Sequence, residues 1–71
     1  MKFTQEEAVT WMVAFLENMR VCHSIGDTKR FYYYAGKANA LRDILEEYYN
    51  WDERYADEHT KAMWDIMDAE W

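Results

Sequence analysis

Few residues of this 71-residue chain have the types and spacing that chemistry requires. Cys22 and His23 are neighbours, but adjacent positions on a helix point about 100° apart, which suits a nucleophile and its base poorly. Asp57, Glu58 and His59 are also consecutive, and consecutive side chains do not converge on one metal ion. We therefore expect no catalytic residue, no metal site and no cofactor, and we predict that the protein is not an enzyme.

A cationic and aromatic triplet suggests a ligand of another kind. Arg30, Tyr33 and Lys37 share a helical face at i, i+3 and i+7, where they could hold a phosphate and a stacked base. Nucleic-acid-binding proteins usually present a basic field, yet residues 27–50 carry four basic and four acidic side chains. We therefore do not expect direct nucleic-acid binding, and we expect these cationic stems to lie over apolar neighbours.

The elements that position these residues are predicted to be helices, because the chain has no proline and only two glycines. Thr4 and Glu7 in "TQEE" match a capping box, and apolar residues recur every three or four positions over about 5–23. Gly26 indicates a turn, after which Asp27 or Thr28 begins a second helix over about 28–49. These two helices would pack against each other.

A third helix is predicted over about 52–70, after a break somewhere in 50–57. Asn50 with Glu53, or alternatively Asp57, supplies its cap. The fold class is all-α, a small three-helix bundle in a single domain over residues 1–71. The alternative is a chain without this break, which would form a long helical hairpin that dimerises.

The helical spacing predicts which residues form the core. The three apolar stripes are Ala8, Met12, Phe15, Met19 and Cys22, widened by Trp11 and Leu16; Phe31, Tyr34, Ala35, Ala38, Leu41, Leu45, Tyr48 and Tyr49; and Trp51, Tyr55, His59, Ala62, Met63, Ile66 and Met67.

The chain has more aromatic surface than a small core needs, with four tryptophans, six tyrosines and three phenylalanines. On the second helix, Gly36 and Ala40 stand four apart beside Tyr32 and Tyr33, as in helices that approach closely. On the third helix, two tryptophans lie seven apart among acidic residues, and either a partner or the protein's own core could cover them. The predicted partner-binding residues are Tyr32, Tyr33, Gly36, Ala40, Trp64, Asp68 and Trp71.

Charge and cysteine content complete the sequence-based prediction. The net charge is −6, and residues 51–71 carry seven acidic against two basic side chains. The single Cys22 excludes an internal disulfide, and the chain has neither a leader-like start nor an apolar run of about 20 residues. We therefore expect a cytoplasmic protein without membrane contact.

The function predicted from these features is protein–protein interaction through an aromatic and acidic surface, in a protein that forms a homodimer. The alternative is a nucleic-acid mimic, whose acidic third helix would occupy a basic site on a nucleic-acid-processing enzyme. The overall composition is similar to that of small acidic bacteriophage proteins that inhibit host or defence enzymes. This similarity implies an inhibitor or regulator of a larger enzyme.

Overall fold

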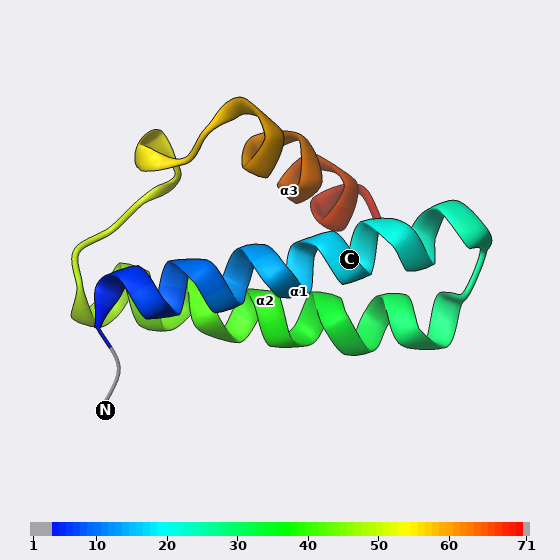
Figure 1. Cartoon of the computed structure of the whole chain (residues 1–71), viewed down its shortest axis with the longest axis horizontal. Helices are drawn as coiled ribbons and strands as arrows, with labels where there is room; N and C mark the ends of the chain where they lie inside the picture. Colours follow the sequence, from blue (N-terminus) through cyan, green and yellow to red (C-terminus); the bar gives the residue numbers. More distant parts are fainter. Residues whose placement is uncertain (1–3, 71) are drawn as a thin grey trace.

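The computed structural model describes residues 4–70 as three α-helices and their connections (Figure 1). Helices α1 (Gln5–Ile25) and α2 (Thr28–Tyr48) form an antiparallel hairpin, and α3 (Glu58–Glu70) lies across it. Only the turn between α1 and α2 is short; the connection over residues 49–57 is longer and contains a 3₁₀ helix, η1 (Glu53–Tyr55). The prediction of a small three-helix bundle is confirmed, because the chain turns back after α2 instead of continuing as one long helix.

Local capping sets the ends of the hairpin. The N–H of Glu7 donates to Thr4 Oγ1 over 3.1 Å, and the N–H of Thr4 donates to the Glu7 carboxylate over 3.3 Å. This confirms the predicted capping box. Gly26 ends α1 with a φ of 76°, a left-handed conformation that glycine adopts without strain. Asp27 Oδ1 then accepts the N–H of Arg30 over 3.3 Å, so that the second helix begins directly after the turn.

The third helix is shorter than predicted at its N-terminal end. Asn50 has a φ of 55°, a left-handed conformation in which the α2 helix cannot continue. Asp57 Oδ1 accepts the N–H of Thr60 over 2.8 Å and caps α3. The break within 50–57 is therefore confirmed and Asp57, not Asn50, is the cap, whereas the start predicted at residue 52 is wrong.

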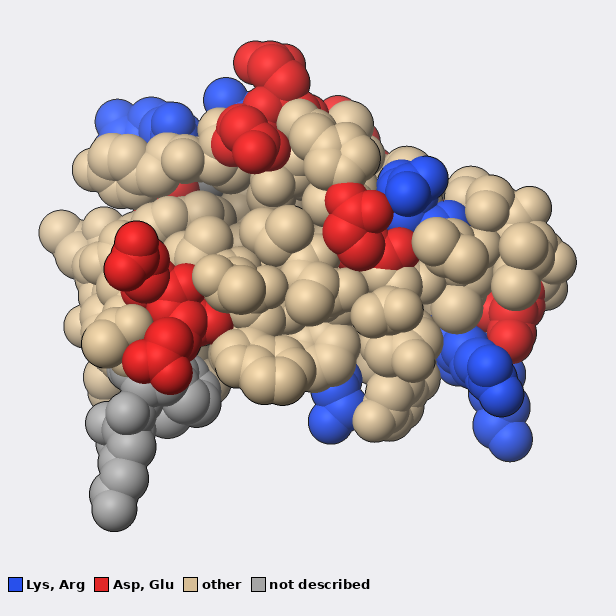
Figure 2. All heavy atoms as spheres, in the orientation of Figure 1, with Lys and Arg blue, Asp and Glu red and all other residues tan. Residues whose placement is uncertain are grey.

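Charged side chains are spread unevenly over the surface (Figure 2). In this orientation, acidic side chains gather over α3 and near the start of α1, whereas the middle of α1 presents a broad uncharged area. The sequence explains this area, because residues 8–16 contain no aspartate, glutamate, lysine or arginine. This stretch of α1 therefore carries no charge on any side, a pattern typical of helices covered on more than one side.

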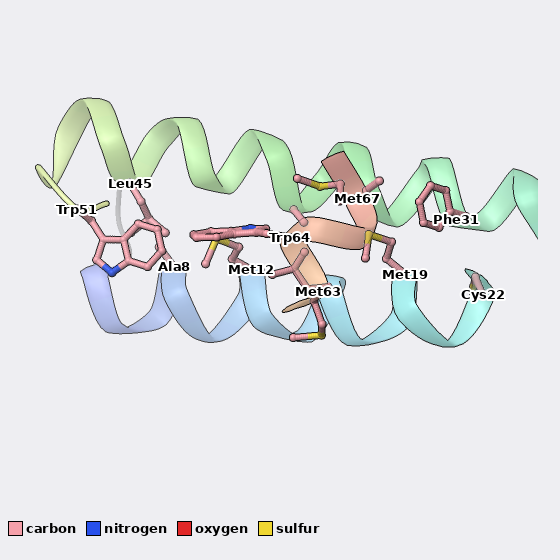
Figure 3. Packing of buried hydrophobic residues seen from close by; sticks show 13 residues of the cluster. Ala8, Met12, Met19, Cys22, Phe31, Leu45, Trp51, Met63, Trp64 and Met67 are labelled. Carbon is pink, nitrogen blue, oxygen red and sulfur yellow. The ribbon is translucent and has the colours of Figure 1, made fainter. Parts of the chain in front are cut away.

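The core lies where α3 packs over α1 and α2, and its methionine, leucine and tryptophan side chains meet between the helices (Figure 3). α3 contributes Thr60, Met63, Trp64 and Met67. The indole of Trp64 meets that of Trp51 edge to face, with ring centroids 5.4 Å apart. The buried hydrophobic residues are Ala8, Met12, Leu16, Met19, Cys22, Phe31, Ala35, Ala38, Leu45, Trp51, Met63, Trp64 and Met67.

Several positions of the predicted stripes are wrong. His59 and Ala62 of α3 are exposed, because the helix is rotated so that the large Trp64 side chain is buried instead. Tyr48 and Tyr55 are 73% and 68% exposed, because they flank the break at which α2 ends and the chain reverses. Trp11, which widened the first stripe, is 56% exposed.

Candidate functional site

An apolar groove lies between α1 and α2 on the side of the hairpin away from α3. Trp11 and Phe15 of α1, with Lys37, Ala40 and Leu41 of α2, line an open volume of about 350 Å³. We call these five residues the open groove. They define the open face of the hairpin, as opposed to the covered face on which α3 lies.

The direction of the side chains on α2 separates the two faces. Arg42 reaches Asp68 of α3 over 3.7 Å. Lys37 precedes Arg42 by five positions, which turns a helix by about 140° at 100° per residue. Lys37 therefore points away from α3 and into the open groove, beside Ala40 and Leu41.

Four aromatic rings form a continuous row on the open face. Trp11 lies 5.9 Å from Phe15, Phe15 lies 6.3 Å from Tyr34, and Tyr34 meets Tyr33 edge to face at 5.1 Å. Phe15 and Tyr34 are half-buried, so they fix the row to the hairpin. Trp11 and Tyr33, at its two ends, are 56% and 57% exposed. The row thus presents two large rings to solvent on a rigid base.

Lys37 lies over this row. Its ammonium is 5.1 Å from the ring centroid of Tyr33 and 6.0 Å from that of Phe15, within the range of a cation–π interaction. Among the described side chains of residues 4–70, no carboxylate lies within 4.0 Å of it. The open groove therefore combines an apolar floor with one cation that aromatic rings, rather than an acid, hold in place.

The covered face also has a cation of α2 over an aromatic ring, but there a carboxylate of α3 pairs with the cation. The Arg42 guanidinium lies 5.4 Å from the ring centroid of Trp64. Its nitrogens also lie 3.7 Å from Asp68 and 4.0 Å from Glu46. Trp64 keeps only 1% of its surface exposed. The helix that covers this face thus supplies both the apolar contact and a carboxylate for the cation of α2.

Two histidine–glutamate contacts lie between α1 and α3. Near the start of α3, His59 Nε2 donates a hydrogen bond to the Glu17 carboxylate. That hydrogen bond and a second one from Arg20 lower the pKa of Glu17. At the end of α3, His23 Nε2 lies 3.6 Å from the Glu70 carboxylate. Both histidines of the chain therefore serve the α1–α3 contact.

The predicted partner-binding residues do not form one surface. Tyr33 lies on the open face, and Ala40 lines the open groove. Gly36, one turn before Ala40, is half-buried. Tyr32 is directed to the end of α3, where its hydroxyl donates to the backbone carbonyl of Glu70 over 3.1 Å. Asp68 of α3 pairs with the α2 arginine on the covered face.

Only one of the two tryptophans predicted as partner-binding residues on the third helix can be placed in the structure. Trp64 is buried between α1 and α2, so of the two alternatives left open for it, self-packing holds and an exposed anchor does not. Trp71 lies outside the described residues. The sequence-based reasoning missed Trp11 and Phe15, because their spacing also fits the core stripe. The uncharged stretch 8–16 was the signal that could have identified a second apolar side of this helix.

Other kinds of site are not found in the described part of the chain. Within residues 4–70, no three histidine, cysteine, aspartate or glutamate side chains are grouped so that they could hold a metal ion. None of the described helices has the length and apolar character to span a membrane. Comparisons with protein families, curated proteins and solved structures found no match for this chain.

Proposed function

We propose that the protein is a protein-interaction module, not an enzyme, and that its open groove receives a helix of a partner protein. The observation that carries this proposal is the row of rings on the open face, with Trp11 and Tyr33 more than half exposed beside an apolar groove of about 350 Å³. Exposed tryptophan and tyrosine on a rigid base are typical anchors of protein interfaces.

The shape of the groove favours a helix over a loop or a strand. The groove runs between two antiparallel helices of 21 residues each, which are roughly 30 Å long at about 1.5 Å per residue. The same hairpin already packs a 13-residue helix, α3, on its covered face. A helix laid into an apolar groove is a recurrent mode of peptide recognition.

The exposed rings of this face offer a favourable contribution to binding. Covering the exposed half of one large aromatic side chain removes roughly 100 Å² from water, which contributes about 2–3 kcal/mol. Trp11 and Tyr33 each offer such a contribution. Two anchors of this size are typical of interfaces in which a few residues dominate the affinity.

The alternative of a nucleic-acid mimic has less support. Some of the carboxylates in residues 51–71 that would imitate phosphates lie beside basic side chains of the same chain: Asp68 beside Arg42, Glu70 beside His23, and Asp52 beside Arg54 at 2.8 Å. A mimic needs a dense, unpaired negative surface, and its binding would weaken steeply as salt is added. Docking through aromatic rings would persist under the same conditions.

A matched pair of cross-linking positions tests the proposal. Tyr33 on the open face and Tyr55 on η1 are both tyrosines and both more than half exposed. Each is replaced in turn by a photoreactive benzoylphenylalanine in the cells that make the protein. We expect protein adducts from position 33 that the substitution Ala40→Arg abolishes, because the arginine would fill the groove.

The contrary results are equally specific. Three results would each contradict a docking groove. Positions 33 and 55 could give adducts in equal yield, the adducts from position 33 could persist with Ala40→Arg, or position 33 could give no adduct. Ala40 is exposed on α2, and arginine is a good helix former. The variant should therefore keep the circular dichroism and melting temperature of the parent protein.

A further inference from the structure

We propose that the open groove selects an acidic amphipathic helix: one with apolar residues at i, i+3 or i+4, and i+7, and with an aspartate or glutamate that pairs with Lys37. This inference rests on the proposed function and adds the chemistry of the partner. It also assigns to Lys37 the role of the residue that determines specificity.

The covered face shows how this hairpin binds a helix. α3 directs Met63, Trp64 and Met67 into the core at the spacing of an apolar stripe. One position after Met67, Asp68 reaches Arg42, which lies over the ring of Trp64. The helix that fits here is therefore apolar on one side and carries an acid beside the stripe, where it meets the cation of α2.

The open face has the corresponding groups on the hairpin side. Trp11, Phe15 and Tyr33 supply the apolar surface, and Lys37 supplies the cation over aromatic rings. What Lys37 lacks, among the described side chains, is a carboxylate within 4.0 Å. A docked helix would provide it, as α3 does for Arg42.

The requirement for an acid follows from desolvation. A helix lying in the groove would remove water from the Lys37 ammonium, and burying a cation without an ionic or hydrogen-bonding partner is costly. A carboxylate on the occupant would offset part of this cost, whereas an arginine or lysine there would add like-charge repulsion. The groove therefore discriminates between helices of equal apolar character by their charge.

A second copy of this chain fits the groove less well. Lys37 lies near the middle of α2 (Thr28–Tyr48), and Phe15 lies at the middle of α1 (Gln5–Ile25). Two hairpins that pack through their open faces about a two-fold axis would bring two Lys37 side chains near that axis.

The test selects partners from a displayed library of helices as long as α3, with a fixed apolar stripe and randomised flanking positions. The full-length protein and its Lys37→Glu variant are used as baits in parallel selections. Helices that also bind the Ala40→Arg variant are discarded, because they do not depend on the open groove. We expect aspartate or glutamate to be enriched at one flanking position with the parent protein. Lysine or arginine should be enriched at that position with Lys37→Glu.

Binding measurements with one selected peptide then give the size of the contribution that its acid makes to affinity. Replacing its acid by the amide should weaken binding to the parent protein about tenfold, since a hydrogen-bonded charge contributes roughly 1.5–3 kcal/mol and tenfold is about 1.4 kcal/mol. The same replacement should change binding to Lys37→Met by less than about twofold. Lys37 is exposed, so circular dichroism should confirm that both lysine variants keep the helical content of the parent protein.

Other results overturn the inference in distinguishable ways. One result would be selected helices that fail to bind Ala40→Arg but show no charge preference, or a preference that Lys37→Glu does not reverse. This result would refute the acidic partner while leaving the docking groove intact. A library from which every binder also binds Ala40→Arg would refute the docking groove itself.

Two further outcomes would identify a different occupant. A dimer of the parent protein by light scattering, converted to monomer by Ala40→Arg, would show that the occupant is a second copy. Binding of a short single-stranded DNA oligonucleotide that Ala40→Arg abolishes would show a nucleic-acid site. Either result would overturn the acidic helix as the occupant.

Discussion

On the covered face of the α1–α2 hairpin, Trp64 keeps 1% of its surface exposed, whereas on the open face Trp11 keeps 56%. Both tryptophans have another aromatic ring beside them, and on each face a cation from α2 lies over a ring. The faces differ in that α3 covers one of them and supplies Asp68 to Arg42. One hairpin therefore carries the same side-chain chemistry on both sides, with a third helix on one side and, in our proposal, a partner helix on the other.

The two tryptophans give the sharpest way to break this comparison. We expect Trp64→Ala to lower the free energy of unfolding by about 3–5 kcal/mol, because it leaves a cavity in the core. Trp11→Ala should change that free energy by less than about 1 kcal/mol, because its ring is more than half exposed. Urea denaturation followed by circular dichroism measures both. Equal losses would mean that Trp11 belongs to the core and that the open face is not a separate surface.

Substitutions of the two cations of α2 should also affect stability more on the covered face than on the open face, but by a smaller amount. Arg42→Met should lower the free energy of unfolding by about 1 kcal/mol, because it removes the contacts with the Trp64 ring and with Asp68. Lys37→Met should change stability by less than about 0.5 kcal/mol and act on partner binding instead. Melting curves of both variants check this difference. A larger loss for Lys37→Met would assign Lys37 a folding role.

Acid should loosen the covered face through the carboxylates that hold α3. Hydrogen bonds from His59 and then from Arg20 lower the pKa of Glu17, and the backbone N–H of Thr60, followed by its side chain, lowers that of Asp57. A lowered folded-state pKa contributes stability above the ordinary carboxyl range, near pH 4, and that stability is lost as the pH falls through the lowered values.

We therefore expect the amides of α3 to lose protection from hydrogen exchange as the pH falls below about 4, before those of the hairpin do. Glu17→Gln should reduce the pH dependence, because the amide does not titrate. Hairpin amides that lose protection at the same pH as those of α3, in both proteins, would show that the histidine–glutamate pair does not control the docking of α3.

The local sequence signals predicted the hairpin well, because short-range hydrogen bonds set its ends. Thr4 and Glu7 form the capping box that their spacing indicates, and Gly26 adopts the left-handed turn that ends α1. Of the two residues predicted to begin α2, Asp27 and Thr28, Asp27 is its cap. In each case the decisive atoms lie within four positions of each other, so the sequence alone contains the necessary information.

The third helix could be predicted only in part, because its rotation depends on packing between distant residues. Trp, Met, Ala and Ile residues occur around most of this helix, so the apolar pattern allowed a core face with His59 and Ala62. The observed face contains Thr60 and Trp64. Burying the large indole against Trp51 and beneath Arg42 selects this rotation, and spacing along the helix does not encode those partners.

The candidate site was predicted on α2 but not on α1. Tyr33 and Ala40 were placed on a second helical face, where the structure has them. Both Trp11 and Phe15 were assigned to the core stripe; Phe15 does pack against the core while also lining the groove, whereas Trp11 is exposed. Helical spacing gives the angular position of a side chain but not the side on which a third helix will pack. The packing of α3 determines which side of the hairpin is covered and which stays open.

The most direct test of the docking groove is a nuclear magnetic resonance titration of the labelled protein with an acidic helix obtained from the selection. The indole N–H signals of Trp11 and Trp64 report on the two faces separately. We predict that binding shifts the Trp11 signal and gives intermolecular contacts to Phe15, Ala40 and Leu41, while the Trp64 signal stays in place. A shift of Trp64 with Trp11 unchanged, or contacts centred on α3, would contradict recognition through the open face.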